Sequence, residues 1–251
     1  MRVEFLNVGG IELSWFPYMT DNEAKTLRWI EGFAELSALE IRRISLQCRW
    51  RWYKPHDRIL SQEDSTNDVF FVVQGKIRIV TYSEAGKEIS FRDLGAGRIF
   101  GELAAIDGLP RSASAVALSD ALLASMPAKL YLQTLQGSPA LSMACLKRLS
   151  QLVRALSERV VEFATMPVRD RILAELARMA VRRPTTPAIW VIDPMPTHSE
   201  IANRVATHRE AVTRVLRKLA DDGVVSRRGR ALIVSDIRRL SPQARQDKML
   251  D

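Results

Sequence analysis

Residues 100–117 read FGELAAIDGLPRSASAVA, and this stretch says more about fold and chemistry than any other part of the chain. Gly101 follows a strand-like run, and the next residues can begin a short helix whose free N–H groups point toward an anion. Because glycine has no Cβ, the backbone at Gly101 can approach a ligand closely. Farther along, Arg111 supplies a planar cationic fork and Ser112 supplies a hydroxyl.

Glu102 adds an acceptor that suits a ribose hydroxyl, the role that an acidic residue has in dinucleotide-binding folds. Together these side chains predict a site for a small phosphate ester that also carries a sugar. The alternative interpretation is a surface ion pair between Glu102 and Arg111, and their spacing alone does not decide between the two.

Short strand-like runs surround this stretch, separated by turns rich in glycine, proline and aspartate. They cover residues 49–53, 69–73, 76–82, 88–94 and 113–118. Many short strands with frequent turns are typical of an antiparallel sandwich or jelly roll. Before them, apolar residues recur every three or four positions from 25 to 46, which predicts short helices.

A long helix is predicted to begin near Ser138-Pro139, because serine caps helices and proline is tolerated in the first turn. Its apolar residues follow the spacing of a heptad seam: Leu146, Leu149, Val153, Leu156, Val160 and Phe163. Charged residues flank this seam: Lys147, Arg148, Arg154, Glu158, Arg159 and Glu162. The pattern favours a parallel dimer, and the alternative is a helix packed on the sheet of its own chain. Met166-Pro167 is predicted to end the helix.

The last third of the chain follows the order of a winged helix-turn-helix. A helical run at 168–181 and a short strand at 189–192 precede two helices at 197–205 and 207–221. A strand, a basic glycine turn and a second strand then cover 224–234. Thr197 with Glu200 and Thr207 with Glu210 have the spacing of capping boxes that start the two helices.

Polar residues near the start of the second of these helices fit a reader of DNA bases: His208, Arg209, Glu210, Thr213 and Arg214. Arginine pairs with guanine O6 and N7, and glutamate accepts from the cytosine amino group. Thr197 and His198, at the start of the preceding helix, belong to the same predicted DNA-binding set. Phosphate contacts are predicted for Arg204, Arg217, Lys218, Arg227, Arg228 and Arg230. The alternative is a solvated helix face with local ion pairs.

The composition supports a nucleic-acid partner. Of 251 residues, 47% are apolar and 26% are charged, which excludes wholesale disorder. The net charge is +8, and residues 166–251 hold seventeen Lys and Arg against ten Asp and Glu, so they carry almost all the excess. No apolar run is long enough to span a membrane, and the first residues do not resemble a secretory signal peptide. Two cysteines are too few for a disulfide framework. We therefore predict a cytoplasmic protein without membrane contact.

The string GELAAIDGLPRSA closely resembles the phosphate-binding cassette of cyclic-nucleotide-binding domains. The whole order of motifs, from about residue 25 to 240, resembles the cyclic AMP receptor protein family of bacterial transcription regulators. The resemblance implies an α+β fold with an antiparallel β jelly roll, a long dimerisation helix and a C-terminal winged helix-turn-helix. It divides the chain into an extension (1–24), a nucleotide-binding domain (25–137), the dimerisation helix (138–166) and a DNA-binding domain (167–251).

The resemblance also implies roles for the cassette. Glu102 takes the ribose 2′-hydroxyl, Gly101 and Leu103 lie in the backbone cradle, and Arg111 and Ser112 hold the cyclic phosphate.

On the long helix the family has a Thr-Ser pair near the nucleobase, with the serine reaching across from the partner subunit. Here the pair is Leu156-Ser157, so leucine replaces a hydrogen-bonding residue. This departure leaves the base selectivity open, with cyclic AMP as the first choice of ligand and cyclic GMP close behind.

At the DNA end, the Arg-Glu-x-x-x-Arg pattern of the family is intact as Arg209, Glu210 and Arg214. It implies a homodimer, formed through the 138–166 helix, on a double-stranded palindrome with half-sites resembling TGTGA, with RNA polymerase as a further partner. His208 stands where the family often has a small hydroxyl residue.

Other classes of protein fit less well. Cys48 and Cys145 cannot form the iron–sulfur cluster of oxygen-sensing relatives, and His56 is a poor haem ligand because it lies in a turn. We find no catalytic set, metal cluster or P-loop, so we predict neither an enzyme nor a metal cofactor. A family member that binds DNA without needing nucleotide stays open, and its DNA affinity would not respond to added nucleotide.

Overall fold

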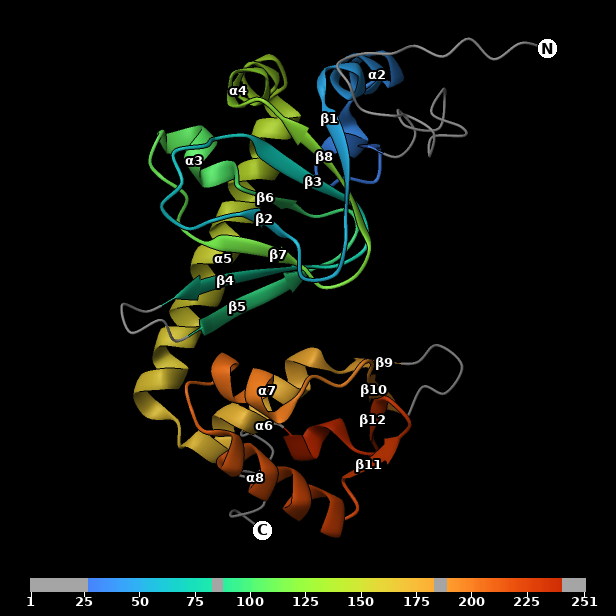
Figure 1. Cartoon of the computed structure of the whole chain (residues 1–251), viewed down its shortest axis with the longest axis vertical. Helices are drawn as coiled ribbons and strands as arrows, with labels where there is room; N and C mark the ends of the chain where they lie inside the picture. Colours follow the sequence, from blue (N-terminus) through green and yellow to red (C-terminus); the bar gives the residue numbers. More distant parts are fainter. Residues whose placement is uncertain (1–26, 83–87, 183–188, 241–251) are drawn as a thin grey trace, which may run out of the picture. The chain divides into compact units, whose positions relative to one another are not determined.

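The computed structural model describes residues 27–82, 88–182 and 189–240 (Figure 1). The chain divides into two compact units, one of residues 1–79 and 93–147 and the other of residues 80–92 and 148–251. Each unit is described by itself. The predicted extension at 1–24 lies outside the described residues.

The strands β1 to β8 form two four-stranded sheets. One has the order β1-β8-β3-β6, from Arg49–Tyr53, Ala121–Met126, Val69–Gln74 and Ile99–Phe100. The other has the order β2-β7-β4-β5, from Arg58–Leu60, Ser114–Ala117, Ile77–Tyr82 and Glu88–Leu94. The β1·β8, β3·β8, β3·β6 and β2·β7 pairs are antiparallel.

Alternation along β3 shows how this unit is layered. Val72 lies in one core with residues of both sheets, including Ile77 and Leu123, so the two sheets pack face to face. Val69 and Phe71, on the opposite side of the strand, lie in a second core with the helices of the unit. The predicted antiparallel β jelly roll is confirmed.

The helices of the first unit are η1 (Phe33–Glu35), α2 (Ala38–Gln47), α3 (Glu102–Asp107) and α4 (Ala128–Gly137). The Phe33 ring lies 5.1 Å from the Phe71 ring, which joins η1 to β3. The strands β2 and β6 were not predicted, because two or three residues show no period, and β8 and α4 were not predicted either.

The long helix α5 spans Pro139–Thr165, and α6 follows over Val168–Met179, so the predicted break at Met166-Pro167 is confirmed. The Ser138 hydroxyl accepts from the Leu141 N–H at 3.3 Å, as expected for a cap. Most of the predicted seam is solvent-exposed, with Val153 at 63% and Val160 at 67%. Within the described ranges, no helix is long and apolar enough to cross a membrane.

The second unit has the predicted order of helix, turn, helix and hairpin. Its further elements are β9 (Val181–Arg182), β10 (Trp190–Ile192), α7 (His198–Arg204), α8 (Arg209–Asp221), β11 (Val225–Arg228), β12 (Ala231–Val234) and η2 (Ile237–Leu240). Its sheet has the order β11-β12-β10-β9. Apolar residues of α6, α7, α8 and the sheet share one buried core, which includes Leu173, Ile201, Val212 and Val234. The predicted winged helix-turn-helix is confirmed.

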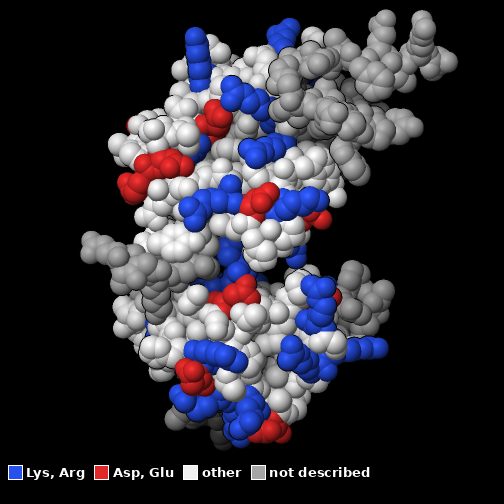
Figure 2. Space-filling view, viewed as in Figure 1, with Lys and Arg blue, Asp and Glu red and all other residues white. Residues whose placement is uncertain are grey.

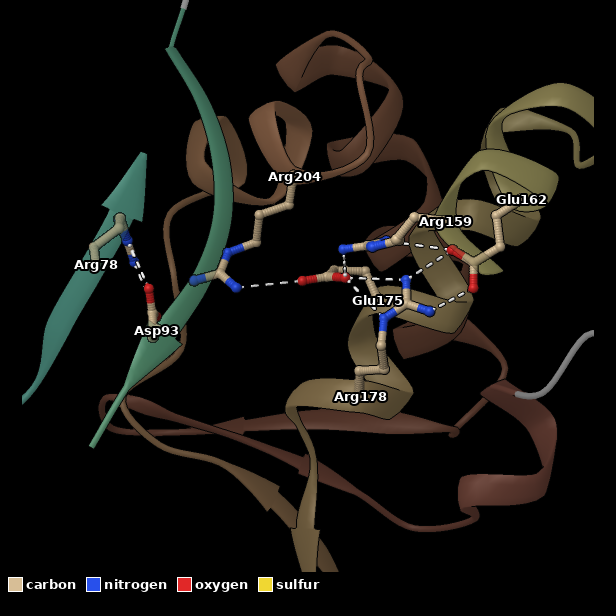
Figure 3. Close-up of polar contacts among 7 residues, drawn as sticks. All are labelled: Arg78, Asp93, Arg159, Glu162, Glu175, Arg178 and Arg204. Atoms are coloured by element: carbon tan, nitrogen blue, oxygen red, sulfur yellow. Dashed lines mark hydrogen bonds and ion pairs between the residues drawn. The ribbon is translucent and has the colours of Figure 1, made fainter. Parts of the chain in front are cut away.

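A buried carboxylate on α6, Glu175, joins three helices of the second unit (Figure 3). Its side chain is 3% exposed. One oxygen accepts from Arg159 of α5 at 2.6 Å and from Arg178 at 3.1 Å. The other oxygen lies 3.4 Å from Arg204 of α7. Glu162 of α5 closes the cluster by pairing with Arg178 at 2.6 Å.

This cluster corrects two expectations. Arg159 and Glu162 were assigned to the flanks of a dimer seam, but both pair with α6 of the same chain. Arg204 was expected on a DNA phosphate, but it is 7% exposed and pairs with Glu175. Spacing along one helix does not show these partners, because they lie on other helices.

We expect Glu175→Ala to lower the local unfolding free energy of α6 by about 3 kcal/mol, because removing one partner leaves buried charge uncompensated. The readout is native-state hydrogen exchange of the α6 amides, since a chain of two units need not unfold in one step.

Glu158→Ala is the matched control, because Glu158 is an exposed carboxylate on α5 and its removal should cost less than about 0.5 kcal/mol. Equal protection of α6 in the two variants would show that the cluster does not hold the helices together.

Candidate functional site

Gly101 occupies a position that only glycine fits. It precedes α3 with φ of 78°, a left-handed conformation that side chains disfavour. A Cβ there would lie 2.7 Å from Nη1 of Arg111 and 3.1 Å from the Asp68 carbonyl. Other atoms of the protein therefore approach the backbone at Gly101 closely, and they include the guanidinium of Arg111 from the same cassette.

Arg111 is 2% exposed, and contacts from three directions fix its guanidinium. Nη1 donates to the Gly101 carbonyl and Nη2 to the Asp68 carbonyl, both at 2.8 Å. Nε donates to the Thr66 hydroxyl at 3.1 Å, and the guanidinium lies 5.8 Å from the Phe70 ring centre. Each Nη nitrogen keeps one further N–H with which it can donate to a ligand.

Neutral groups hold this cation, while carboxylates balance it from nearby. Burial lowers the pKa of Arg111, and the charges of Asp68, Asp64 and Glu102 oppose that effect. The guanidinium stays protonated, since arginine does not lose its proton in proteins. The site is therefore a fixed positive charge beside the start of α3.

The other predicted ligand residues fall into two groups. Glu102 is buried at the first position of α3, Leu103 is half-buried, and Ser112 is exposed beside Arg111.

Leu156 and Ser157 lie on α5 in the second unit and are exposed, and the Ser157 hydroxyl donates to the Val153 carbonyl at 3.0 Å. Their predicted place near a nucleobase stays a prediction.

Sequence reasoning missed Thr66 and Asp68, which hold Arg111, and Phe70, which lies beside it. They are more than forty residues from Arg111 in the chain, and two of the contacts use a backbone carbonyl or a ring rather than a distinctive polar side chain. No spacing signal points to them.

The helix-turn-helix is built largely as predicted. Thr197 and Glu200 form a full capping box, in which the Glu200 carboxylate accepts from the Thr197 N–H at 2.7 Å. The prediction for Thr207 was wrong, because α8 begins after His208, which makes no side-chain cap bond. Instead the Thr207 N–H donates to the Ala202 carbonyl at 3.0 Å, within the turn between the helices.

The polar residues predicted to read DNA lie on one part of the second unit. His208, Arg209, Glu210 and Arg214 are exposed at the start of α8. Arg227, Arg228 and Arg230 are exposed on the β11–β12 hairpin, whose turn contains Gly229 with φ of 60°. Lys218, by contrast, pairs with Asp222 at 2.8 Å. Figure 2 shows that Lys and Arg outnumber Asp and Glu on the visible face of this unit.

A hydrogen bond connects the two helices beside this surface. Nδ1 of His198, the first residue of α7, lies 2.8 Å from the Thr213 hydroxyl of α8. That hydroxyl in turn donates to the Arg209 carbonyl at 3.0 Å. Thr213 is therefore half-buried and held in place, whereas its predicted neighbours on α8 are exposed.

The described residues include no group of three or more His, Cys, Asp or Glu placed to hold a metal ion. Cys48 is buried, which raises the pKa of its thiol to about 12 and keeps it a packed, unreactive group.

Comparison with known proteins identifies both domains. The family model of the cyclic nucleotide-binding domain matches residues 50–138, and that of the Crp-like helix-turn-helix domain matches residues 170–242. The cyclic AMP receptor protein of Thermus thermophilus is 30% identical over 175 residues, 70% of this chain and 78% of that protein. The cAMP-activated global regulator CRP of Haemophilus influenzae is 27% identical over 191 residues, 74% of this chain and 84% of that protein.

Solved structures share the fold. The c-di-GMP responsive regulator CLP of Xanthomonas campestris matches with a TM-score of 0.67 and 23% identity, over 79% of this chain and 99% of that one. A CRP/FNR family regulator from Thermus thermophilus matches with a TM-score of 0.60 and 25% identity, over 78% of this chain and 98% of that one. The chain belongs to the cyclic AMP receptor protein family, and it is a cyclic-nucleotide-binding, DNA-binding transcription regulator rather than an enzyme.

Proposed function

We propose that this regulator is a cytoplasmic homodimer that binds cyclic AMP as its allosteric ligand, with cyclic GMP as the second candidate. The observation that carries the proposal is the buried Arg111 guanidinium, fixed beside Gly101 with N–H groups to spare. A fixed cation beside a glycine-lined helix start suits a cyclic phosphate, and Ser112 adds an exposed hydroxyl. Glu102 takes the ribose hydroxyl in this proposal, with Leu103 in the backbone cradle.

The choice of base depends on the α5 residues. Leu156 offers no hydrogen bond to a nucleobase, so selectivity falls to Ser157 and to Ser112, whose hydroxyl can also meet a guanine amino group. Relatives that match along most of their length carry names that specify cyclic AMP, which favours it as the ligand.

The exposed apolar residues of α5 support the homodimer. Leu146, Val153, Leu156 and Val160 are 43–67% exposed along one helix. In this proposal, α5 (within 138–166) joins two copies, each with a nucleotide-binding domain (25–137) and a DNA-binding domain (167–251). Two recognition helices then read a palindrome with TGTGA-like half-sites about one turn, ~34 Å, apart.

Nucleotide acts by shifting the dimer between two states. Contacts at the cassette and at Ser157 favour the state whose α8 helices fit successive major grooves. DNA affinity changes only by as much as the nucleotide prefers that state. RNA polymerase is the further partner that a regulator of this family would contact.

One observation favours a second candidate, a regulator that binds DNA without nucleotide. Arg111 already donates to the carbonyls of Gly101 and Asp68, so the cassette holds together by itself. Titrating the protein with cyclic AMP and with cyclic GMP, and measuring DNA affinity with and without each nucleotide, separates the two candidates, because the second predicts no effect of either nucleotide on DNA affinity.

In that titration, Arg111→Ala should weaken nucleotide binding by at least about a hundredfold, since a lost pair of charge-assisted hydrogen bonds costs about 3 kcal/mol. Arg111→Lys keeps the charge without the planar fork, so its nucleotide affinity should lie between those of the parent and of Arg111→Ala. Weak non-specific DNA binding should persist in both variants. Arg58→Ala, at an exposed arginine of β2, is the control and should bind as the parent does. A normal nucleotide response from Arg111→Ala would contradict the cassette assignment.

On the DNA side, Glu210→Ala should lose about 1–3 kcal/mol of discrimination at one base pair and leave nucleotide affinity unchanged. Fluorescence anisotropy with duplexes substituted one base at a time measures this loss. Asp221→Ala removes an exposed carboxylate from the far end of the same helix and should keep the full preference. If Glu210→Ala kept the full base preference as Asp221→Ala does, Glu210 would not read a base.

The seam is tested by Val153→Glu, which places a charge among apolar residues and should turn the dimer into a monomer in sedimentation velocity. Gln151→Glu, exposed and outside the heptad seam of α5, should leave the dimer intact. A dimer that persists in the Val153 variant would place the interface elsewhere.

A further inference from the structure

We propose that His198 makes DNA binding proton-linked: its imidazole, hydrogen-bonded to Thr213 of the recognition helix, takes up a proton at Nε2 when a DNA phosphate arrives. This inference rests on the proposed DNA-binding role of α7 and α8 and adds a regulatory input to it, namely pH.

The hydrogen bonds assign the protons. A threonine hydroxyl has one hydrogen, and Thr213 places it on the Arg209 carbonyl at 3.0 Å. With that hydrogen on the Arg209 carbonyl, we assign the His198 Nδ1, at 2.8 Å from the same oxygen, as the donor. A neutral ring that carries its hydrogen on Nδ1 has its lone pair on Nε2, so Nε2 is the nitrogen that can accept a proton.

The surroundings favour the neutral form of this ring in the free protein. Burial lowers the pKa of His198, and the positive charges of Arg209 on α8 and Arg227 on β11 lower it further. On its own helix, Glu200 is engaged with the Thr197 N–H and hydroxyl in the capping box. The histidine thus lies in a positive environment shared by the starts of both helices and the hairpin.

DNA reverses this environment. The first helix of a helix-turn-helix crosses the DNA backbone, and arginines near α7 and α8 attract phosphates. A phosphate favours the charged imidazole, so the pKa of His198 rises in the complex. DNA affinity then increases as pH falls through the pKa of the complex, and it levels off below the pKa of the free protein.

The test measures DNA affinity of the full chain between about pH 5.5 and 8 at constant salt, with saturating cyclic AMP. Two duplexes are used: a palindrome with TGTGA half-sites and a scrambled sequence. We expect affinity to rise about tenfold on acidification for each unit by which DNA shifts the pKa. Both duplexes should show the rise, because phosphates carry no sequence information.

Three variants isolate the histidine. His198→Asn keeps a donor for Thr213 without a titrating ring, so it should abolish the pH dependence and retain base preference. His198→Ala should lose both the pH dependence and some base preference, since Thr213 loses its donor. His56→Asn removes an exposed histidine from the turn between β1 and β2, outside the DNA-binding domain, and should keep the pH dependence of the parent.

Long-range ¹⁵N–¹H spectra of the imidazole give a direct second measurement. They should show the Nδ1–H form in the free protein and a higher pKa in the complex. An Nε2–H form, an unchanged pKa, or a His198→Asn protein that keeps its pH dependence would overturn the inference while leaving the proposed function intact. Failure to bind either duplex at any pH would overturn both.

Discussion

A carboxylate withdrawn from solvent, Glu175, needs positive partners, and it finds them on three helices at once. Because a buried charge is tolerated only when it is paired, Glu175 stabilises the arrangement in which α5, α6 and α7 meet at this point. The core of the unit does not supply this constraint, since apolar packing tolerates small shifts and rotations. The end of α5 and the helix-turn-helix therefore behave as one body, and a signal that moves this end of α5 also moves the DNA-reading helices.

Arg111 is a buried cation, and it is held by different groups from those that hold the buried carboxylate of Glu175. Carbonyls and a hydroxyl hold it directly, and the nearest carboxylates act only through their field. Such a cation can meet a phosphate without first breaking an ion pair. The strongly paired cluster is thus suited to rigidity and the loosely compensated one to binding, although both depend on buried arginine.

The sequence predicted most elements whose pattern is local. Short strand-like runs bounded by turns located β3 and β4, proline located the break between α5 and α6, and Thr197 with Glu200 predicted a real capping box. It failed where a side chain has a choice of partners. Arg204 carries the same charge as the arginines of the hairpin, and only the packing of α7 on α6 shows that it faces Glu175. Thr207 has the spacing of a cap, but the turn ends one residue later.

The position of the Arg111 guanidinium is sensitive to substitution at Gly101. Its left-handed backbone and the 2.7 Å separation between a virtual Cβ and Nη1 of Arg111 mean that even a methyl group would displace the guanidinium. Under the proposed function, Gly101→Ala would weaken nucleotide binding and leave the helix-turn-helix intact, because the helix-turn-helix lies in a separate unit. In the proposed regulator, this single substitution would give a protein that still binds DNA but no longer responds to nucleotide.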